Sequence, residues 1–284
     1  MATFYNQATL TYNGNTATSN ITVGEIVDTL SVTKTAISPT YSAGDTVSFI
    51  IHLKNTGTTE LNNLTLTDNL GSYTYDTLSL VPLTYVNGSI RYFINGTLQA
   101  APIVTANDNL TISGINVPAD SIVTIAYETD INSYAPLSAE ASITNTVSIT
   151  GDGLAETITA DETINPDTSL LLSITKSMNP TTVSENGQLT YTFTIQNTSN
   201  TPAVAADNVS VTDTFDPALN NISVTFNNTA WSQTTNYEYN EETGLFTTIP
   251  GQIAVPAATY TQNTTTGEWI VTPGTSILTV TGTI

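Results

Sequence analysis

Short runs of alternating apolar and polar residues recur along the whole chain, and Gly, Pro or Asn bounds most of them. Typical runs are TVSFIIHL, NLTLTDNL, SIVTIAYET, QLTYTFTIQN, NVSVTDTF and SILTVTGTI. Alternation with a period of two predicts strands with one buried and one solvated face, which is typical of an antiparallel sandwich. No helical period is sustained for long. The chain is therefore predicted to be all-β.

A long internal repeat divides the chain into two units. One copy starts at Leu30 (LSVTKTAISPTYSAGDTVSFIIHLKNTGTTELNNLTLTDNLG) and the other at Leu172 (LSITKSMNPTTVSENGQLTYTFTIQNTSNTPAVAADNVSVTDTFDP), 142 residues later (172 − 30). This length suits an immunoglobulin-like sandwich with extra loops. The repeat predicts two tandem immunoglobulin-like β-sandwich domains over residues 28–151 and 171–284, joined by a linker over residues 152–170.

The two copies end differently. The first continues past PADSIVTIAYETDI into the strand ASITNTVSITGDG, whereas the second stops at Ile284 after PGTSILTVTGTI. The second domain is thus predicted to lack its last strand, which leaves unpaired backbone groups and apolar core at an open edge. Residues 4–14 resemble the missing strand, because NQATLTYNG matches NTVSITGDG. We expect residues 1–20 to be a donor strand with its linker.

Residue types that are seldom buried without a partner fall on the inward faces of these predicted strands. By the strand period of two, each of them shares a face with apolar neighbours. They are Lys34, Asp68 and Asn145 in the first domain, Lys176 and Asp213 in the second, and Asn6 in the N-terminal strand. The inward face of the donor strand comprises Phe4, Asn6, Ala8, Leu10 and Tyr12.

These residues suggest a covalent cross-link. A buried lysine loses its proton more easily because desolvation disfavours the charged form, and the neutral amine is a nucleophile. A buried aspartic acid keeps its proton for the same reason and can polarise a carboxamide oxygen. Attack of the lysine amine on the asparagine side chain would expel ammonia and leave an amide, with the aspartic acid moving protons. The structural alternative is a buried Lys–Asp ion pair with Asn hydrogen-bonded beside it and no reaction.

Two such links are predicted. Lys34 and Asn145 would be joined within the chain, with Asp68 as the acid. The loop closed by this link has 111 residues (145 − 34). Lys176 would be joined to Asn6 of a neighbouring subunit, with Asp213 as the acid.

Composition narrows the function classes. The chain has 284 residues, four Lys+Arg against 24 Asp+Glu for a net charge of −20, and no cysteine. Two of the four cations are Lys34 and Lys176, which singles out this repeated position. So acidic a chain repels nucleic acid and anionic membranes, and without cysteine it has no disulfides. We expect no nucleic-acid partner, no membrane insertion, no Sec signal and no cofactor.

The pattern TK…GDTVSF…NTG…LTLTD…ITNTVSI resembles a bacterial surface repeat catalogued as domain of unknown function 11. That repeat is similar in fold to immunoglobulin-like modules of Gram-positive adhesins and pili, many of which contain Lys–Asn isopeptide bonds with an acidic catalyst. The resemblance spans both domains and the two Asn strands. Carried over by position, it implies one site at Lys34, Asp68 and Asn145, and part of another at Lys176 and Asp213. The second domain departs from the pattern because it has no Asn strand of its own.

Together these features predict a structural subunit of a bacterial extracellular filament whose main partner is itself. Each subunit would lend its N-terminal strand to the open edge of the next subunit's second domain, head to tail. The competing arrangement is a strand that folds back onto its own second domain. The lack of cysteine and of a secretion signal fits a spore-associated appendage on the cell or spore surface, with an anchoring protein there as a further partner.

Other function classes compete with this prediction. A surface adhesin or surface-layer module would bind glycan or protein through its loops. Its candidate contacts are the aromatic residues of NTAWSQTTNYEYNEETG, namely Trp231, Tyr237 and Tyr239. An enzyme is disfavoured because the single histidine, His52, lies on the outward face of its strand. The acids of the predicted linker could hold calcium, but no EF-hand spacing is present and a solvated linker is the simpler interpretation. These acids are Asp161, Glu162 and Asp167.

Overall fold

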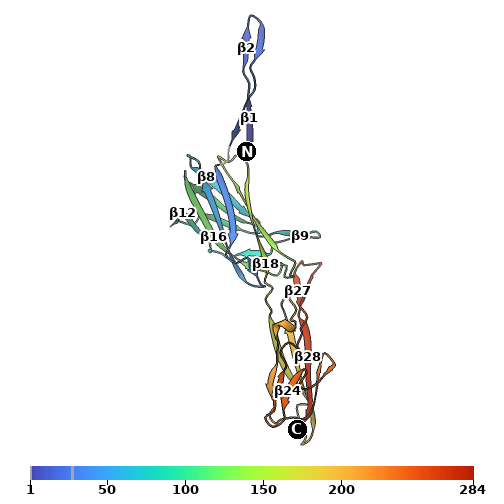
Figure 1. Cartoon of the computed structure of the whole chain (residues 1–284). Helices are drawn as coiled ribbons and strands as arrows, with labels where there is room; N and C mark the ends of the chain where they lie inside the picture. The colour runs from blue at the N-terminus through green and yellow to red at the C-terminus, as the bar shows by residue number, and fades with distance from the viewer. Residues whose placement is uncertain (1, 27–28) are drawn as a thin grey trace. The chain divides into compact units, whose positions relative to one another are not determined.

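The computed structural model describes residues 2–26 and 29–284, and nearly all of its regular elements are strands (Figure 1). The helical exception within these residues is one turn of 3-10 helix, η1 (Ala205–Asp207). The chain divides into two compact units, Met1–Pro136 with Ser142–Asn165, and Leu137–Ala141 with Pro166–Ile284. The predicted all-β fold class is confirmed. No helix within the described ranges has the length and apolar character needed to span a membrane.

The first unit begins with a hairpin of two arms, each made of two short strands. Its strands are β1 (Ala2–Asn6), β2 (Thr9–Tyr12), β3 (Asn15–Thr18) and β4 (Thr22–Ile26), with β1 paired to β4 and β2 to β3. The turn consists of Asn13 and Gly14, with φ of 46° and 80°. Positive φ at both positions defines the type I′ turn that matches the twist of a hairpin. Residues 15–26 thus form a second arm, and the prediction of a single donor strand followed by a linker needs this correction.

The rest of the first unit is a sandwich of two sheets. Its first sheet has the order β13-β12-β16-β7-β5, and β11 also pairs with β16. It comprises β5 (Leu30–Ala36), β7 (Thr46–Asn55), β11 (Leu83–Tyr85), β12 (Arg91–Ile94), β13 (Thr97–Leu98) and β16 (Ser121–Ile131). The facing sheet has the order β14-β15-β8-β17-β18-β6. It comprises β6 (Thr40–Tyr41), β8 (Leu61–Asp68), β14 (Ile103–Ala106), β15 (Leu110–Val117), β17 (Ile143–Thr150) and β18 (Ile158–Pro166). A separate ribbon is made by β9 (Tyr73–Tyr75) and β10 (Leu78–Leu80).

The predicted linker over residues 152–170 is wrong for its central part, which is a strand. Residues 158–166 form β18, which pairs with β17 from Ile149↔Ile158 to Ile143↔Ile164. The side chains of β18 alternate, so that Ile164 is fully buried while Asp161 is exposed. The acidic residues that suggested a solvated linker therefore belong to a half-buried strand with one outward face.

The second unit repeats the first sheet and truncates the facing one. Its first sheet has the order β19-β20-β28-β22-β23, which matches β5-β7-β16-β12-β13, and its facing sheet is β21-β25-β24. The strands are β19 (Leu172–Asn179), β20 (Gln188–Asn197), β21 (Thr212–Thr214), β22 (Asn220–Phe226), β23 (Thr229–Trp231), β24 (Tyr237–Asn240), β25 (Leu245–Thr248), β26 (Thr259–Gln262), β27 (Trp269–Thr272) and β28 (Gly274–Thr283). The last strand, the counterpart of β17, is absent from the described residues of this unit, as predicted, and so is a counterpart of β18.

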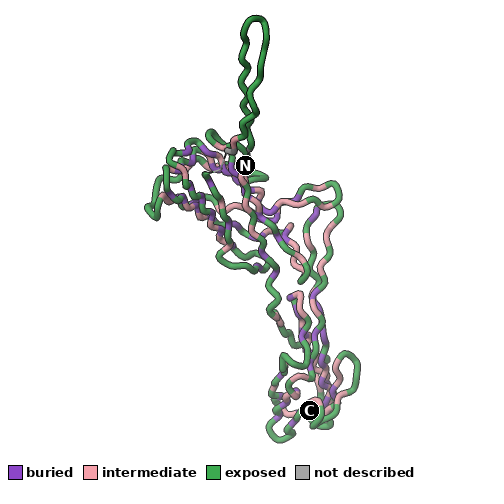
Figure 2. The backbone as a smooth tube through the Cα atoms, turned by 45° about the horizontal axis from the view of Figure 1, so that its top comes forward, coloured by how far each residue is buried: buried purple, intermediate pink, exposed green. Residues whose placement is uncertain are grey.

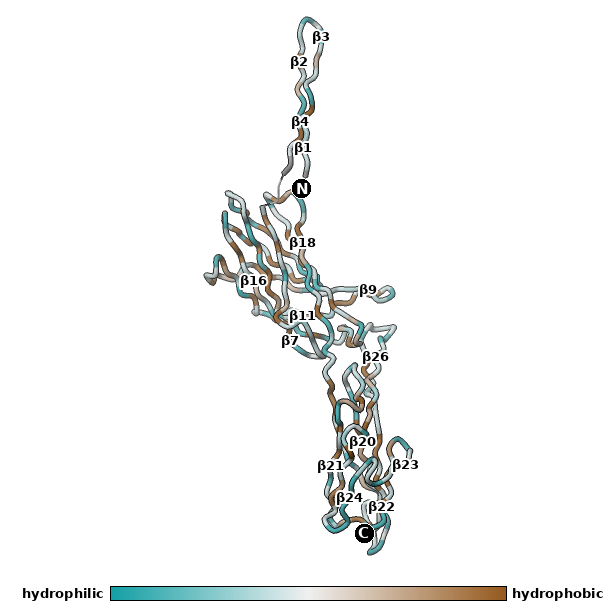
Figure 3. Tube along the Cα trace, in the orientation of Figure 1, coloured by the Kyte–Doolittle hydropathy of each residue, from teal (hydrophilic) through white to brown (hydrophobic). Residues whose placement is uncertain are grey.

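Burial follows the strand alternation. In the first unit, Phe49, Ile51 and Leu53 of β7 and Leu64 and Leu66 of β8 are all fully buried. The second unit has its own core around Phe193, Phe215, Phe246, Leu278 and Val280. The hairpin differs from both, because every side chain from residue 3 to residue 23 is exposed (Figure 2). Hydrophobic positions nevertheless continue into its strands β1 and β4 (Figure 3).

Candidate functional site

Three strands bring Lys34, Asp68 and Asn145 together inside the first sandwich. Lys34 lies on β5 of one sheet, whereas Asp68 ends β8 and Asn145 lies on the adjacent β17 of the facing sheet. Their exposed fractions are 4%, 0% and 0%. The Lys34 Nζ donates to Asp68 Oδ2 at 2.6 Å. The inward placement expected from the strand period is therefore observed for all three residues.

Tyr127 on β16 connects the acid to the carboxamide. Its hydroxyl donates to Asp68 Oδ2 and accepts a hydrogen bond from Asn145 Nδ2 at 3.3 Å. The other Asp68 oxygen accepts the backbone N–H of Leu70 at 2.9 Å. Asn145 Oδ1 is buried and has no hydrogen-bond partner in the parts of the chain that the structure describes. An unpaired buried carbonyl is costly, and such groups are often found where chemistry takes place.

Burial sets the protonation of the cluster. Desolvation lowers the pKa of Lys34 from 10.5 to about 8, against the opposing effect of the nearby Asp68 carboxylate. Desolvation, reinforced by the charge of Asp68, raises the pKa of Tyr127 well above its usual 10. The tyrosine thus keeps its proton and can donate it, while Lys34 gives up a proton more readily than a lysine in water. A poised amine, an acid and a carboxamide lie in one water-excluded cluster.

The second unit contains the same ion pair in an open setting. Lys176 Nζ donates to Asp213 Oδ2, but the two side chains are 38% and 20% exposed. The ammonium lies 4.3 Å from the ring centroid of Tyr191 and 5.2 Å from that of Phe215. Among the described residues, no asparagine side chain forms a hydrogen bond with either partner of this pair. This site therefore has the amine and the acid of the first one but not its carboxamide.

The neighbours of Lys176 are uncovered in the same way. Ile174 and Met178, which share its face of β19, are 51% and 36% exposed. The corresponding residues beside Lys34 on β5, Val32 and Ala36, are each half-buried. In the first unit, Asn145 of β17 is connected to the Lys34 pair through Tyr127, and the charges of Glu162 and Asp161 on β18 act on Lys34. The second unit leaves that face open.

The predicted donor residues lie in the exposed hairpin. Asn6 ends β1 opposite Thr22 of β4. Three large side chains of its predicted face are more than half exposed: Phe4 at 54%, Leu10 at 64% and Tyr12 at 54%. Ala8 lies between β1 and β2 and is also exposed. The hairpin thus presents an apolar face with one carboxamide on it.

Tyr127 was missed at the level of sequence, although a signal was present. In SIVTIAYETDI the strand period places Tyr127 on the inward face with Ile125, and a buried tyrosine hydroxyl nearly always needs a partner. The second unit arranges its aromatic residues differently. Tyr127 stands opposite Phe49, whereas Val280 at the equivalent position of β28 stands opposite Tyr191. In the second unit the tyrosine of this pair is therefore on β20, the counterpart of β7, and not on β28, the counterpart of β16.

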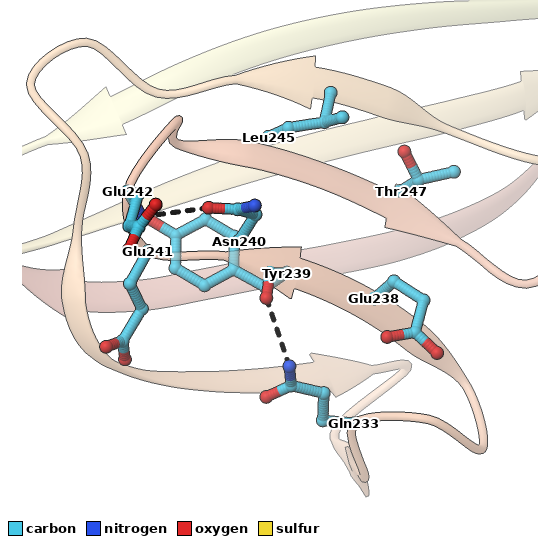
Figure 4. A pocket seen from close by; sticks show the side chains of 8 residues that line it. All are labelled: Gln233, Glu238, Tyr239, Asn240, Glu241, Glu242, Leu245 and Thr247. Atoms are coloured by element: carbon cyan, nitrogen blue, oxygen red, sulfur yellow. Dashed lines mark hydrogen bonds between the residues drawn. The ribbon is translucent and has the colours of Figure 1, made fainter.

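The aromatic residues proposed for glycan binding are not free to stack on a sugar. Tyr237 and Tyr239 are only 5% and 8% exposed, and Trp231 stacks on Phe226 with ring centroids 4.9 Å apart. The Tyr239 hydroxyl is bonded to both the N–H and the C=O of Leu219. A hollow of about 700 Å³ lies over Tyr239, and polar residues line most of it, including the hydrogen-bonded Gln233 (Figure 4). Tyr237 and Tyr239 belong to the hydrophobic core of the second unit, and Trp231 packs against that core.

The remaining sequence candidates lie apart from the cluster or beside it. Asp167 accepts a hydrogen bond from the backbone N–H of Ser169, and this contact lowers the pKa of Asp167. Within the described ranges no group of three metal-binding side chains occurs. Glu162 is half-buried and directly opposite Asn145 on β18, so it belongs to the surroundings of the Lys34 cluster. His52 is exposed and bonded to Thr124.

Comparison with known proteins gives fold-level likeness only. No protein-family model matches the chain, and no curated protein matches it significantly. Among solved structures, the major pilin subunit BcpA of Bacillus cereus is 13% identical, with 72% of this chain and 69% of that chain covered and a TM-score of 0.38. The pilus backbone protein RrgB of Streptococcus pneumoniae is 13% identical, with coverages of 86% and 55% and a TM-score of 0.35.

A C-terminal fragment of the major pilin of Streptococcus agalactiae is 14% identical, with coverages of 52% and 58% and a TM-score of 0.35. The chain thus spans little more than half the length of the two streptococcal structures. Similarity at this level assigns neither a family nor a function to the chain, so the functional argument depends on the two lysine clusters.

Proposed function

We propose that this chain is the structural subunit of a bacterial surface filament, sealed within and between subunits by Lys–Asn amide bonds. The observation that carries the proposal is the contrast between the two clusters. Lys34 and Asp68 are fully enclosed with a carboxamide beside them, whereas Lys176 and Asp213 form the same pair beside an uncovered face. A second site with the same amine and acid, but without its carboxamide, calls for an asparagine from another segment.

In the first domain the reaction would proceed without outside reagents. The Lys34 ammonium passes a proton to Asp68, and the neutral amine attacks Asn145 Cγ. The Nζ–Cγ bond forms and the Cγ–Nδ2 bond breaks, and Nδ2, which already holds two hydrogens, takes one proton from Asp68 and one from the attacking nitrogen and leaves as an ammonium ion, so that Asp68 is again a carboxylate. The low pKa of Lys34 favours the first step, and the unpaired Asn145 Oδ1 is free to accept a proton or hydrogen bond as charge develops on it.

In the second domain the missing carboxamide would be Asn6 of another copy. Asn6 shares its predicted face with Phe4, Leu10 and Tyr12, as Asn145 shares its own with Ile143, Val147 and Ile149. Burying these exposed side chains against the open face of the next subunit would remove apolar surface from water on both sides. The contact is head to tail, and unless its rotation closes into a ring, repeated contacts build an open filament.

Location and anchoring form part of the same proposal. The proposed filament would lie on the outside of a bacterial cell or spore, with an anchoring protein at its base, as the sequence resemblance to domain of unknown function 11 suggests. The net charge of −20 favours a fibre that stays dispersed rather than one that binds nucleic acid or anionic membranes.

Deleting residues 2–26 tests the proposal. The shortened chain should remain monomeric in sedimentation while its first domain still loses the mass of one ammonia, because Lys34, Asp68 and Asn145 are all retained. Polymers formed by the shortened chain would contradict it. An intact chain that stays monomeric yet contains an Asn6–Lys176 link would show that the segment folds back onto its own second domain.

A further inference from the structure

We infer that the donor element is the whole N-terminal hairpin, residues 2–26, and that its two arms occupy two adjacent vacant strand positions in the second domain of another copy of this chain. The inference depends on the proposed function and specifies its contact surface. A donor of one strand and a donor of two strands make opposite predictions about whether the hairpin must open.

The first domain provides the template. There β17 and β18 form a hairpin that lies between β8 on one side and β6 on the other. Val147 of β17 pairs with Asp68 of β8, and on the far side the N–H of Asn165 in β18 donates to the carbonyl of Pro39 beside β6. The sheet is therefore completed by two strands inserted as a unit.

The second domain has both of these vacancies. Its strand β21, the counterpart of β8, pairs with β25 on one side only. The counterpart of β6 is found by aligning the two copies, which places Thr182 and Val183 where Thr40 and Tyr41 stand. These two residues belong to no strand in the described structure, whereas their equivalents pair with β18. A single donated strand would satisfy β21 and leave a gap of one strand before residues 182–183.

The N-terminal hairpin has the dimensions of the missing pair. It runs from Ala2 to Ile26, and the β17–β18 hairpin runs from Ile143 to Pro166. Both bend at a glycine with positive φ, Gly14 at 80° and Gly153 at 87°. In both, the asparagine lies opposite a residue of the return arm: Asn145 pairs with Glu162, and Asn6 pairs with Thr22.

The hairpin is preformed for insertion, because its arms pack on one another. A Cβ at Gly24 would lie 2.3 Å from the ring of Phe4, so the ring crosses the return arm where no side chain stands. Val23 of the return arm is also exposed, at 61%, but it pairs with Tyr5 and so lies on the face opposite Asn6. The exposed apolar residues on the face of Asn6 are costly in a free chain and are expected to be covered.

Chain connectivity supports the same arrangement. After β18 the chain passes through a short connection into β19, the first strand of the second domain, and after β4 it passes through a short connection into β5, the first strand of the first domain. With the hairpin of one subunit seated in the second domain of the next, the covalent path across the subunit junction repeats the path between domains within one chain. The filament would then be a regular array of sandwiches, each completed by the hairpin that precedes the next.

The test locks the hairpin shut. The chain has no cysteine, so Tyr5→Cys/Val23→Cys, at directly paired positions on the face opposite Asn6, offers a single disulfide across the arms. The full-length double variant is assembled with the disulfide oxidised or reduced, and both samples are then boiled in detergent with reductant. The hairpin donor predicts that oxidised chains form the Asn6–Lys176 ladder and the same polymers at least as fast as reduced chains.

Oxidised chains that fail to assemble while reduced chains assemble would overturn the inference, because the arms must then separate. If both forms fail while the unmodified chain assembles, Thr11→Cys/Thr16→Cys provides the same lock near the turn. If the unmodified chain itself forms no polymer, the proposed function fails, and that outcome is distinct from a failure of the hairpin alone.

A variant of the return arm provides an independent test, because the hairpin donor and the single-strand donor predict opposite changes in the rate of assembly. Thr22→Pro, opposite Asn6, removes a backbone N–H and weakens the pairing of β4 with β1. Insertion of an intact hairpin predicts slower assembly by about tenfold or more. Donation of a single strand predicts faster assembly, because the competing arm is released, and that result would contradict the inference.

Discussion

Lys34 and Asp68 form an ion pair at 2.6 Å with both side chains fully withdrawn from water. Two buried charges of this kind gain little net stability over apolar side chains of similar size. A lysine at the one cationic position that recurs in both domains therefore fits the proposed chemistry better than a purely stabilising role. The Asn145 carboxamide, joined to the pair through Tyr127, supplies the electrophile that such chemistry needs.

Asn145→Ala should abolish the internal cross-link. If the amide closes its 111-residue loop (145 − 34) as a disulfide does, its loss should lower the free energy of unfolding by about 5 kcal/mol. Removing an unreacted Asn that only donates to Tyr127 should cost about 1–3 kcal/mol. Denaturant unfolding together with intact mass separates the two cases. Thr146→Ala, at the next position of β17, is the control and should still form the cross-link, so its mass should be lower by one ammonia than its sequence predicts.

Tyr127→Phe should slow the internal reaction without preventing folding. The substitution keeps the aromatic ring but removes the hydroxyl that donates to Asp68 and accepts from Asn145, so the acid and the leaving nitrogen lose their connection. We expect a rate lower by about tenfold or more, within the range of a lost proton-transfer group. The rate is the loss of ammonia, about 17 Da by stoichiometry, during refolding from denaturant.

Tyr92→Phe is the matched control for this experiment. Its hydroxyl is partly buried and donates to the carbonyl of Asn116, but it belongs to no part of the Lys34 cluster. Equal rates for Tyr127→Phe and the unmodified chain would remove Tyr127 from the reaction and leave it a structural role.

The pH dependence of the internal link has a predicted sign. In the reactive arrangement the shared proton has moved from Lys34 to Asp68, so the pair holds the same number of protons as the ion pair does. The fraction of molecules in the reactive arrangement therefore does not change with pH as long as the pair keeps this proton. The pKa of about 8 for Lys34 marks the loss of that proton. The rate of ammonia release should be flat from neutral pH to about 8 and fall above it. A rate that rises through pH 8 would show an amine acting without its acid.

Stability of the unreacted first domain should follow the same group. The pKa of Lys34 lies at about 8 in the folded chain and near 10.5 when unfolded, so between these values the unfolded chain binds more protons. Stability should therefore rise with pH across this window and be lowest, for this group, below pH 8. Urea unfolding of Asn145→Ala at pH 7 and pH 9.5 measures the change, and a fall in stability at the higher pH would contradict it.

The inward positions of Lys34, Asp68 and Asn145 could be predicted because a period of two leaves only two faces to choose from. Tyr127 escaped prediction because an aromatic residue on an inward face looks like ordinary core until its hydroxyl partners are known. β18 was missed because Asp161 suggested solvent, although an exposed acid is compatible with one face of a strand. The return arm of the hairpin was missed despite Asn13-Gly14, which is a strong turn signal between alternating runs.

Asn6→Ala should separate assembly from sealing. The hairpin keeps its apolar face, so subunits should still join into filaments visible by negative-stain microscopy. Without the carboxamide the filaments should dissolve to monomers in hot detergent, because the remaining contact is noncovalent. Asn20→Ala, which removes another exposed asparagine of the same hairpin, is the control and should leave the ladder intact. Asn6→Ala filaments that still resist boiling would show that another residue makes the link.

The most direct test of the central claim is the intact mass of the boiled, denatured protein combined with a peptide map. The proposal predicts a ladder of covalent multimers, the loss of about 17 Da for each link by stoichiometry, and two branched peptides, Lys34–Asn145 within a subunit and Asn6–Lys176 between subunits. A single species at the full monomer mass with no branched peptide would contradict it. Both lysine clusters would then be unreacted ion pairs.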